Sequence, residues 1–277
     1  MATRSVAMPV RPRGALLRWG RLPALARYLL LLAALIGIWQ AYWVLKDPSP
    51  LQFAPPREVA DAFWSGWQDG TLARVTWTTL RILAIGIGIG ALVALVLVAF
   101  AALSQVGEDL LRLLVSVLNP LPGVALLPLA MLWFGLNTNA LLFVIANSAA
   151  WPIAIALDTG FKTVNPTIVA VGRNIGLSAW RLVSDVLAPA ALPHAISGLK
   201  TAWAFGWRTI IAAELVFGVA GAEGGLGTYI NNAKLFLNMP PLFAGLVTIA
   251  ALGLAFETLF GFLERRTVVR WGMKTST

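Results

Sequence analysis

Three charged side chains interrupt long apolar runs in the C-terminal half of the sequence. Arg208 and Glu214 lie in WAFGWRTIIAAEL, and Glu257 lies in ALGLAFETLF. A charge at the centre of a membrane-spanning helix costs about 2.5–3.5 kcal/mol on insertion scales, so such residues usually face the bundle interior or a water-filled path. Arg208 and Glu214 are six residues apart and project about 120° away from each other on a helix. Two interpretations follow: Arg208 lines a pathway and attracts an anion, or it forms an interhelical ion pair with a partner such as Glu257.

Aromatic and amide side chains in the apolar runs are further candidates for a pathway lining. Trp203 and Trp207 are spaced i, i+4 and share one helix face, which is typical of core or lipid contacts as well as of a substrate platform. Asn147 and Ser148 either line a pore or form interhelical hydrogen bonds. The candidate pathway residues are therefore Asn147, Trp203, Trp207, Arg208, Glu214 and Glu257.

Residue types needed for enzymatic chemistry are scarce. The chain has no cysteine and one histidine, His194, which excludes thiol chemistry and argues against a His-based metal cluster. A G-x-x-x-x-G-K-[ST] phosphate loop is absent from the sequence. IGIGIG lies inside an apolar run, where Gly86 and Gly90 form a G-x-x-x-G pair that favours close helix packing. We expect no catalytic residue, no metal site and no cofactor in this chain.

The composition is that of a membrane protein. The 277 residues are 58% hydrophobic and 12% charged, with a mean hydropathy of +0.79, whereas soluble domains carry about 25% charged residues. The net charge of +9 suits nucleic acid or anionic lipid, but in a polytopic protein an excess of Lys and Arg usually marks cytoplasmic loops. We therefore expect membrane lipid as a partner and no nucleic acid.

Six apolar runs approach the roughly 20 residues that a helix needs to cross a bilayer. Three prolines interrupt the third run, and we expect a kinked span there, since neighbouring helices satisfy the freed carbonyls. The fold class is thus all-α, polytopic, with six transmembrane helices. The expected spans are Tyr28–Leu45, Thr76–Leu103, Leu113–Phe134, Asn139–Leu157, Ala195–Val219 and Leu242–Leu263.

The distribution of basic residues predicts the orientation. With both termini on one side, fifteen Lys and Arg residues fall on that side and four on the other, so the positive-inside rule places both termini in the cytoplasm. The expected organisation is a cytoplasmic basic arm over 1–27, a transmembrane domain over 28–264 and a cytoplasmic tail over 265–277. Within the transmembrane domain we expect an outer amphipathic segment over 46–75, a cytoplasmic loop over 159–194 and an outer loop over 218–241.

The two outer segments have different patterns. In the first, Val59, Phe63 and Trp67 are spaced i, i+4, i+8 after a run of prolines, which predicts a short amphipathic helix suited to the membrane interface. The second, GVAGAEGGLGTYINNAKLFLNMPP, is glycine-rich and then polar, and we expect a re-entrant or capping loop.

The cytoplasmic loop is built for docking. Asn165 before Pro166 is typical of a helix start, Gly176 ends that helix, and Ser178 caps a second one running through Trp180 toward Pro189. A solvated connection does not need the apolar residues Ile175, Leu177, Trp180, Leu182 and Val183. We expect two short helices at an angle that present a small apolar knob to a cytoplasmic partner.

This loop resembles the EAA loop of binding-protein-dependent ABC importer permeases, whose pattern is E-A-A, three residues, Gly, nine residues, then I-x-L-P. Ala170-Val171-Gly172 stands at E-A-A, Gly176 follows at the family's offset, and Val186-Leu187-Ala188-Pro189 stands at I-x-L-P. Ala170 replaces the family's glutamate. Other motifs resemble the nitrate/sulfonate/taurine/bicarbonate permease subfamily, and the resemblance covers roughly Pro55 to Arg266. They are Leu118–Leu136, Leu187–Gly218 and Gly224–Ile230.

The resemblance implies a type I ABC importer permease (MetI-like) fold in the bacterial cytoplasmic (inner) membrane. It implies a second, identical permease copy, separate ATP-binding subunits that hold ATP and Mg, and a periplasmic or lipid-anchored substrate-binding protein. The solute would be a small anion, such as nitrate, a sulfonate or taurine, or else a vitamin precursor or aromatic acid. The residues expected to contact the ATPase are Gly172, Ile175, Gly176, Ser178, Ala179, Trp180, Arg181 and Pro189.

Two other function classes remain open at this point. One is an ATP-independent secondary transporter or channel, although the sequence has no evident inverted repeat. The other is a membrane scaffold subunit without a transport path.

Overall fold

The computed structural model describes residues 23–217, 224–264 and 266, and every regular element in these residues is helical. The all-α fold class expected from the sequence is confirmed. The chain divides into two compact units, residues 1–56 and 57–277, which are described separately. Most of the expected basic arm, residues 218–223 of the expected outer loop and nearly all of the expected tail lie outside the described residues.

The first unit contains one long apolar helix, α1 (Ala24–Lys46). Its 23 residues make a helix about 34 Å long, enough to cross a hydrocarbon core. The chain after α1 folds back along it. Trp39 Nε1 donates a hydrogen bond to the Ala54 carbonyl at 3.1 Å, and the Phe53 and Tyr42 rings meet edge to face with centroids 5.5 Å apart.

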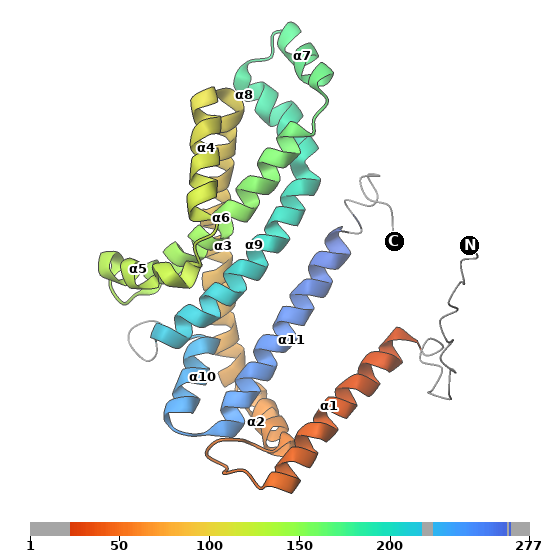
Figure 1. Ribbon diagram of the computed structural model, residues 1–277, viewed down its shortest axis with the longest axis vertical. Helices are drawn as coiled ribbons and strands as arrows, with labels where there is room; N and C mark the ends of the chain where they lie inside the picture. The colour runs from red at the N-terminus through yellow and green to blue at the C-terminus, as the bar shows by residue number, and fades with distance from the viewer. Residues whose placement is uncertain (1–22, 218–223, 265, 267–277) are drawn as a thin grey trace, which may run out of the picture. The chain divides into compact units, whose positions relative to one another are not determined.

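The second unit contains four further helical segments that are long and apolar enough to cross a membrane (Figure 1). With α1 they make five candidate spans in the described residues, or six if one bent pair of helices counts as a span. The unit consists of α2 (Pro56–Gln68), α3 (Thr71–Leu103), α4 (Gln105–Leu118), the 3-10 turn η2 (Gly123–Leu126), α5 (Leu127–Phe134), α6 (Thr138–Lys162), α7 (Pro166–Asn174), α8 (Ala179–Leu182), the π-turn η3 (Val183–Leu187), α9 (Ala188–Phe217), α10 (Leu226–Leu235) and α11 (Met239–Glu264).

Helix α6 is the most buried span and packs along both α3 and α9. Small residues allow these close approaches, as is common where helices pack in membranes. Gly86 and Gly90 of α3 face α6, and Gly198 of α9 lies against Ala156 of α6. The G-x-x-x-G pair therefore serves helix packing, as the sequence predicts.

A methyl group on α3 tests this packing. In Gly90→Ala the new Cβ would lie 2.7 Å from the Ala146 carbonyl oxygen and 3.1 Å from the Ala150 nitrogen. Backbone atoms of α6 cannot swing aside as a side chain can, so the helices must separate, at a cost of about 1–3 kcal/mol. We expect thermal unfolding in detergent to occur several degrees lower. Gly88→Ala is the matched control, because nothing lies within 4 Å of that Cβ; equal melting temperatures for the two variants would contradict the prediction.

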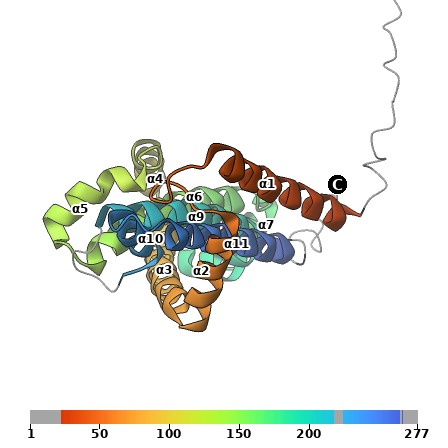
Figure 2. The same cartoon turned by 90° about the horizontal axis from the view of Figure 1, so that it is seen from below.

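The third expected span is broken rather than kinked. Helix α4 and the η2–α5 segment meet at 91°, and α5 projects sideways from the unit in both views (Figures 1 and 2). The prediction of one kinked helix over Leu113–Phe134 is therefore wrong. Pro120 and Pro122 lie in the four residues between the helices, and each lacks the N–H that would continue the helical ladder.

The segment expected as the loop over 159–194 contains the end of α6, the short helices α7 and α8, and the start of α9. Helix α6 continues to Lys162, and α8, η3 and α9 form one continuous helical segment over 179–216. Pro189 therefore does not end the loop; it lies in the first turn of α9, directly after the π-turn. Inside a continuous helical segment a proline lacks the N–H for one backbone hydrogen bond and crowds the preceding turn; the π-turn directly before Pro189 accommodates this irregularity.

Candidate functional site

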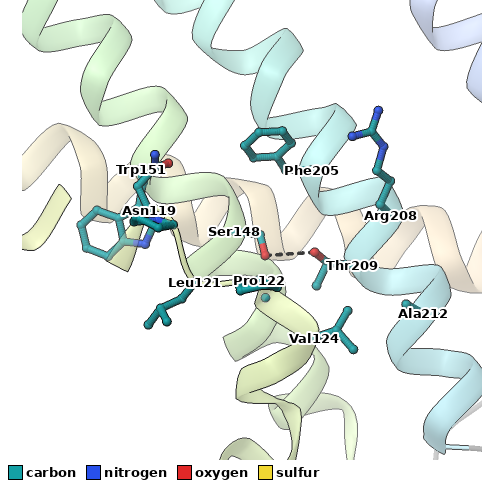
Figure 3. A pocket seen from close by; sticks show the side chains of 12 residues that line it. Asn119, Leu121, Pro122, Val124, Ser148, Trp151, Phe205, Arg208, Thr209 and Ala212 are labelled. Atoms are coloured by element: carbon teal, nitrogen blue, oxygen red, sulfur yellow. Dashed lines mark hydrogen bonds between the residues drawn. The ribbon is translucent and has the colours of Figure 1, made fainter. Parts of the chain in front are cut away.

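An open cavity of about 380 Å³ lies beside the break between α4 and η2 (Figure 3). Three parts of the second unit line it: the segment 119–124 at the break, α6 through Ser148 and Trp151, and α9 through Phe205, Arg208, Thr209 and Ala212. Because the chain is not helical at the break, backbone polar groups are available there alongside these side chains. Non-helical backbone at membrane depth is tolerated where it lines a cavity.

Close packing fixes the wall of this cavity. Gly123 has no room for a Cβ, since Ser148 Oγ and the Thr209 side chain occupy that position. Ser148 Oγ donates to the Val144 carbonyl at 2.9 Å and lies 3.0 Å from Thr209 Oγ1 (Figure 3). The two hydroxyls thus join α6 to α9 directly behind the break. Because Ser148 donates its proton to Val144, Thr209 is the donor between the two hydroxyls, so only lone pairs remain available toward the cavity.

Arg208 is the only basic side chain among the described residues that line this cavity. It is exposed, and within the described part of the chain it makes no hydrogen bond or ion pair. The expected pairing with Glu257 is wrong: Glu257 Oε1 accepts from Lys200 Nζ at 2.8 Å instead. That pair is at least partly exposed, so it contributes little to stability. Arg208 therefore brings to the cavity a positive charge that no described residue neutralises.

The other expected pathway residues lie elsewhere. Trp203 and Trp207 stack at 6.3 Å between centroids, and Trp203 packs on Phe256 of α11. Asn147 lines a second, largely apolar cavity of about 450 Å³ between α3, α5 and α6, and accepts a hydrogen bond from Trp151 Nε1 at 3.1 Å. Among the six candidates, only Arg208 lines the cavity at the break.

Glu214 belongs to a buried network near the C-terminal end of α9, six residues after Arg208. Its side chain is 2% exposed. Oε2 accepts from the Gly227 N–H at 2.8 Å, and Oε1 accepts from the Thr79 hydroxyl at 2.9 Å. The Leu226 N–H donates in turn to Thr79 Oγ1 at 2.8 Å. Glu214 and Thr79 thus satisfy the free N–H groups at the start of α10 and join it to α3 and α9.

The expected pair of short helices, α7 and α8, projects from the opposite end of the unit (Figure 1). Gly176 between them has φ +80°, a left-handed conformation that glycine adopts without strain. Ser178 caps α8 by accepting from the Arg181 N–H at 3.4 Å. Ile175 and Trp180 are 71% and 67% exposed.

The remaining loop residues divide by exposure. Gly172 is buried beneath Leu182, where a Cβ would lie 3.0 Å from Leu182 Cδ1. Ala179 and Arg181 are exposed beside Trp180. Pro189 is also exposed, but on α9 and outside the turn. The turn therefore presents a compact knob, residues 175–181, in which Ile175 and Trp180 are exposed among the described residues and Leu177 is half-buried.

Sequence reasoning missed several residues of the cavity, namely Asn119, Trp151, Phe205 and Thr209. The signal for Phe205 was its helical spacing from Arg208, which places both on one face of α9. No comparable signal marked Asn119, because its place depends on the 91° break. The described residues contain no group of three His, Asp or Glu side chains arranged to hold a metal.

Comparison with known proteins relates this chain to membrane transport. It is 28% identical to the taurine transport system permease protein TauC of Escherichia coli, over 85% of this chain and 86% of that protein. It is 27% identical to the nitrate import permease protein NrtB of Synechocystis, over 89% and 90%. It is 30% identical to the riboflavin transport system permease protein RibX of Chloroflexus aurantiacus, over 95% and 96%.

The fold is that of type I ABC importer permeases. A chain in the crystal structure of an amino acid ABC transporter with histidines superposes with a TM-score of 0.59 at 18% identity, covering 74% of this chain and 98% of that one. The family model of binding-protein-dependent transport system inner membrane components matches residues 86–269. This match includes α6, the loop with α7 and α8, and the Arg208 face of α9. The chain is thus a multi-pass inner-membrane protein that belongs to the family of binding-protein-dependent transport system inner membrane components.

Proposed function

We propose that this chain forms the translocation pathway for a small anionic solute, with the cavity at the helix break as part of that pathway. The observation that carries the proposal is Arg208, an exposed cation in the cavity that has no counter-ion among the described residues. The taurine and nitrate permeases among its relatives support an oxyanion as the solute. Membership in the family favours a permease over an ATP-independent transporter or a scaffold.

The cavity offers donors suited to an oxyanion. The Arg208 guanidinium carries five N–H groups in a planar fork that matches sulfonate or nitrate oxygens. The Asn119 amide, which can add a further N–H donor, lines the same cavity. A weak site of this kind suits transport, because the solute must also leave it. Solute selection before this point belongs to the substrate-binding protein.

Removing the charge tests the proposal. Arg208→Gln is expected to lower ATP-driven uptake of taurine or nitrate by about 10–100-fold, since hydrogen bonds to a charged group contribute about 1.5–3 kcal/mol. Uptake is measured in proteoliposomes that contain the complete transporter with its binding protein. Arg112→Gln is the control, because Arg112 lies on α4, is 71% exposed and is absent from this cavity. Unchanged uptake by Arg208→Gln would contradict the proposal that Arg208 binds an anionic solute in this cavity.

We also propose how the subunit works. The knob at 175–181 contacts a separate ATP-binding subunit that holds ATP and Mg, so the knob and both termini lie in the cytoplasm. Residues 28–264 form the permease domain, and the α10 end faces the binding protein. A second, identical copy completes the pathway. ATP binding moves the knob, and the bundle alternates between outward and inward access as a rigid-body rearrangement.

An uncharged or weakly charged aromatic solute is the second candidate. The riboflavin permease relative favours it, as do Trp151 and Phe205, whose rings line the same cavity as Arg208. The uptake experiment separates the two. If the complete transporter imports riboflavin and not taurine or nitrate, and Arg208→Gln preserves that import, the aromatic solute is the correct one.

A further inference from the structure

Two cavities meet at Phe205 and Asn119. The first holds Arg208, and a further cavity of about 320 Å³ lies on the side of it toward α7 and α8. Phe205 and Asn119 are the only described residues that line both. The cavity on the α8 side is otherwise lined by Pro152, Ile155 and Ala156 of α6 and by Ser197, Gly198 and Thr201 of α9.

One face of α9 connects these cavities. Residues 197, 201, 205, 208 and 212 are spaced by four, four, three and four, so their side chains lie in one line along the helix. From the α8 end they are Ser197, Thr201, Phe205, Arg208 and Ala212. Two hydroxyls therefore precede Phe205 and the cation follows it, while the apolar ring stands between the two polar regions. Figure 3 shows Phe205 and Arg208 projecting from consecutive turns of α9.

We propose that Phe205 is the constriction that separates the Arg208 cavity from the hydroxyl-lined cavity on the α8 side. The inference rests on the proposed function, because it assigns a step in the same pathway. A ring that offers no hydrogen bond resists the passage of a hydrated solute, as apolar constrictions in channels do by excluding water. Asn119, at the start of the break, is the other residue that lines both cavities, so the distance between the break and α9 sets the width of the constriction.

The helix that carries Phe205 also reaches the exposed knob. Residues 179–216 form one helical segment, and Phe205 lies 26 residues from Ala179, about 39 Å along it. On the other side, Asn119 is the C-cap residue of α4 and the first residue of the 91° break. A displacement of the knob relative to α4 is therefore transmitted to the constriction along one continuous helical segment, which includes the π-turn η3. In this proposal Phe205 controls whether the solute passes between the two cavities, whereas Arg208 binds the solute.

The test compares Phe205→Ala with Leu199→Ala in proteoliposomes containing the complete transporter. Leu199 is on the same helix, is 38% exposed and lines neither cavity. Vesicles are preloaded with nitrate or with glycerol, and efflux is measured without ATP. We expect Phe205→Ala to release both probes at least about fivefold faster than the wild type, because loss of the ring lets water fill the constriction. Leu199→Ala should match the wild type, and Phe205→Trp should slow uptake without leakage.

The outcomes separate this inference from the proposed function. If the wild type imports no anion but Phe205→Ala still leaks, the anion proposal fails and the constriction stands. Phe205→Ala without leakage overturns the constriction, whether its uptake is normal or reduced, since reduced uptake alone indicates a packing or contact role. Phe205→Leu, which keeps a smaller apolar side chain, replaces the alanine variant if the latter does not assemble, and an intermediate leak is then expected.

Discussion

Glu214→Ala is expected to be the most destabilising substitution considered, lowering the melting temperature of the detergent-solubilised protein by about 10 °C or more. The reason is the network at the start of α10. Without the carboxylate, the Gly227 N–H and the Thr79 hydroxyl lose their acceptors in a site where Glu214 is 2% exposed. Each buried group left without a partner costs about 1–3 kcal/mol, and about 1 kcal/mol shifts the melting temperature of a protein of this size by about 2–4 °C.

The empty space left by the side chain adds to the loss. Gly225 and Gly227 pack so closely against Glu214 that neither has room for a Cβ. Truncation of a well-packed side chain adds a cavity cost because the surroundings collapse only in part. We expect α10 to detach from α3 and α9, and limited proteolysis to cut the chain near α10 first. Local opening of this kind can precede global unfolding once the hydrogen bonds that fix an element are lost.

Three variants make the Glu214 experiment decisive. Glu257→Ala removes a carboxylate whose side chain is 62% exposed and should shift the melting temperature by little. Thr79→Val should cost less than Glu214→Ala, and the double variant should cost less than the sum, because both residues serve one network. If Glu214→Ala melts within about a degree of the wild type, the network does not hold α10 in place.

Local signals in the sequence predicted the elements that local chemistry determines. Ser178 and Asn165 cap their helices, and Gly176 adopts a positive φ, because caps and left-handed turns depend on residues within one helical turn. Apolar runs likewise predicted five of the spans. The same local logic failed at Pro189. Proline ends many helices, but the π-turn before it lets α8 continue into α9.

Long-range partners were beyond the sequence. Glu214 bonds with Thr79, which is 135 residues away, and Lys200 rather than Arg208 pairs with Glu257. Charges in apolar runs indicated that partners exist, yet spacing within one helix does not identify a partner on another. The cavity itself depends on the break at 119–122. The prolines indicate that the helix is interrupted there, but they do not predict the angle between its two parts. The free-energy cost of a charge in an apolar run identified Arg208 as a candidate. Only the arrangement of α9 and α11 shows that, among the described residues, Glu257 pairs with Lys200 and not with Arg208.

Trp180→Asp is expected to reduce ATP-driven uptake to background in the complete transporter. Trp180 is 67% exposed on the knob, and the nearby Ile175 is 71% exposed. Large aromatic side chains buried at an interface commonly contribute about 2 kcal/mol or more to binding, which corresponds to about 30-fold in affinity. An aspartate there also has to lose its hydration shell, so the ATP-binding subunit should dissociate from the purified complex.

Ala170 bears on how the knob binds the ATP-binding subunit. With alanine where the family pattern has glutamate, this loop has one fewer charge with which to hold the ATP-binding subunit. Shape and apolar area must therefore contribute more, and raising the salt concentration should weaken the complex only slightly. Co-purification of the two subunits at low and high salt measures this directly. Loss of the complex at high salt in the wild type would show that charges such as Arg181 hold it instead.

Two matched variants distinguish loss of docking from loss of folding. Trp180→Phe keeps an aromatic ring and should retain most uptake and co-purification. Val106→Asp places the same charge on another apolar side chain, 72% exposed at the same end of the unit but on α4, and should leave uptake near the wild-type level. Because Trp180 lies outside the packed bundle, Trp180→Asp should keep the wild-type melting temperature while uptake is lost. A Trp180→Asp protein that still binds its ATP-binding subunit and imports solute would exclude the knob as the coupling contact.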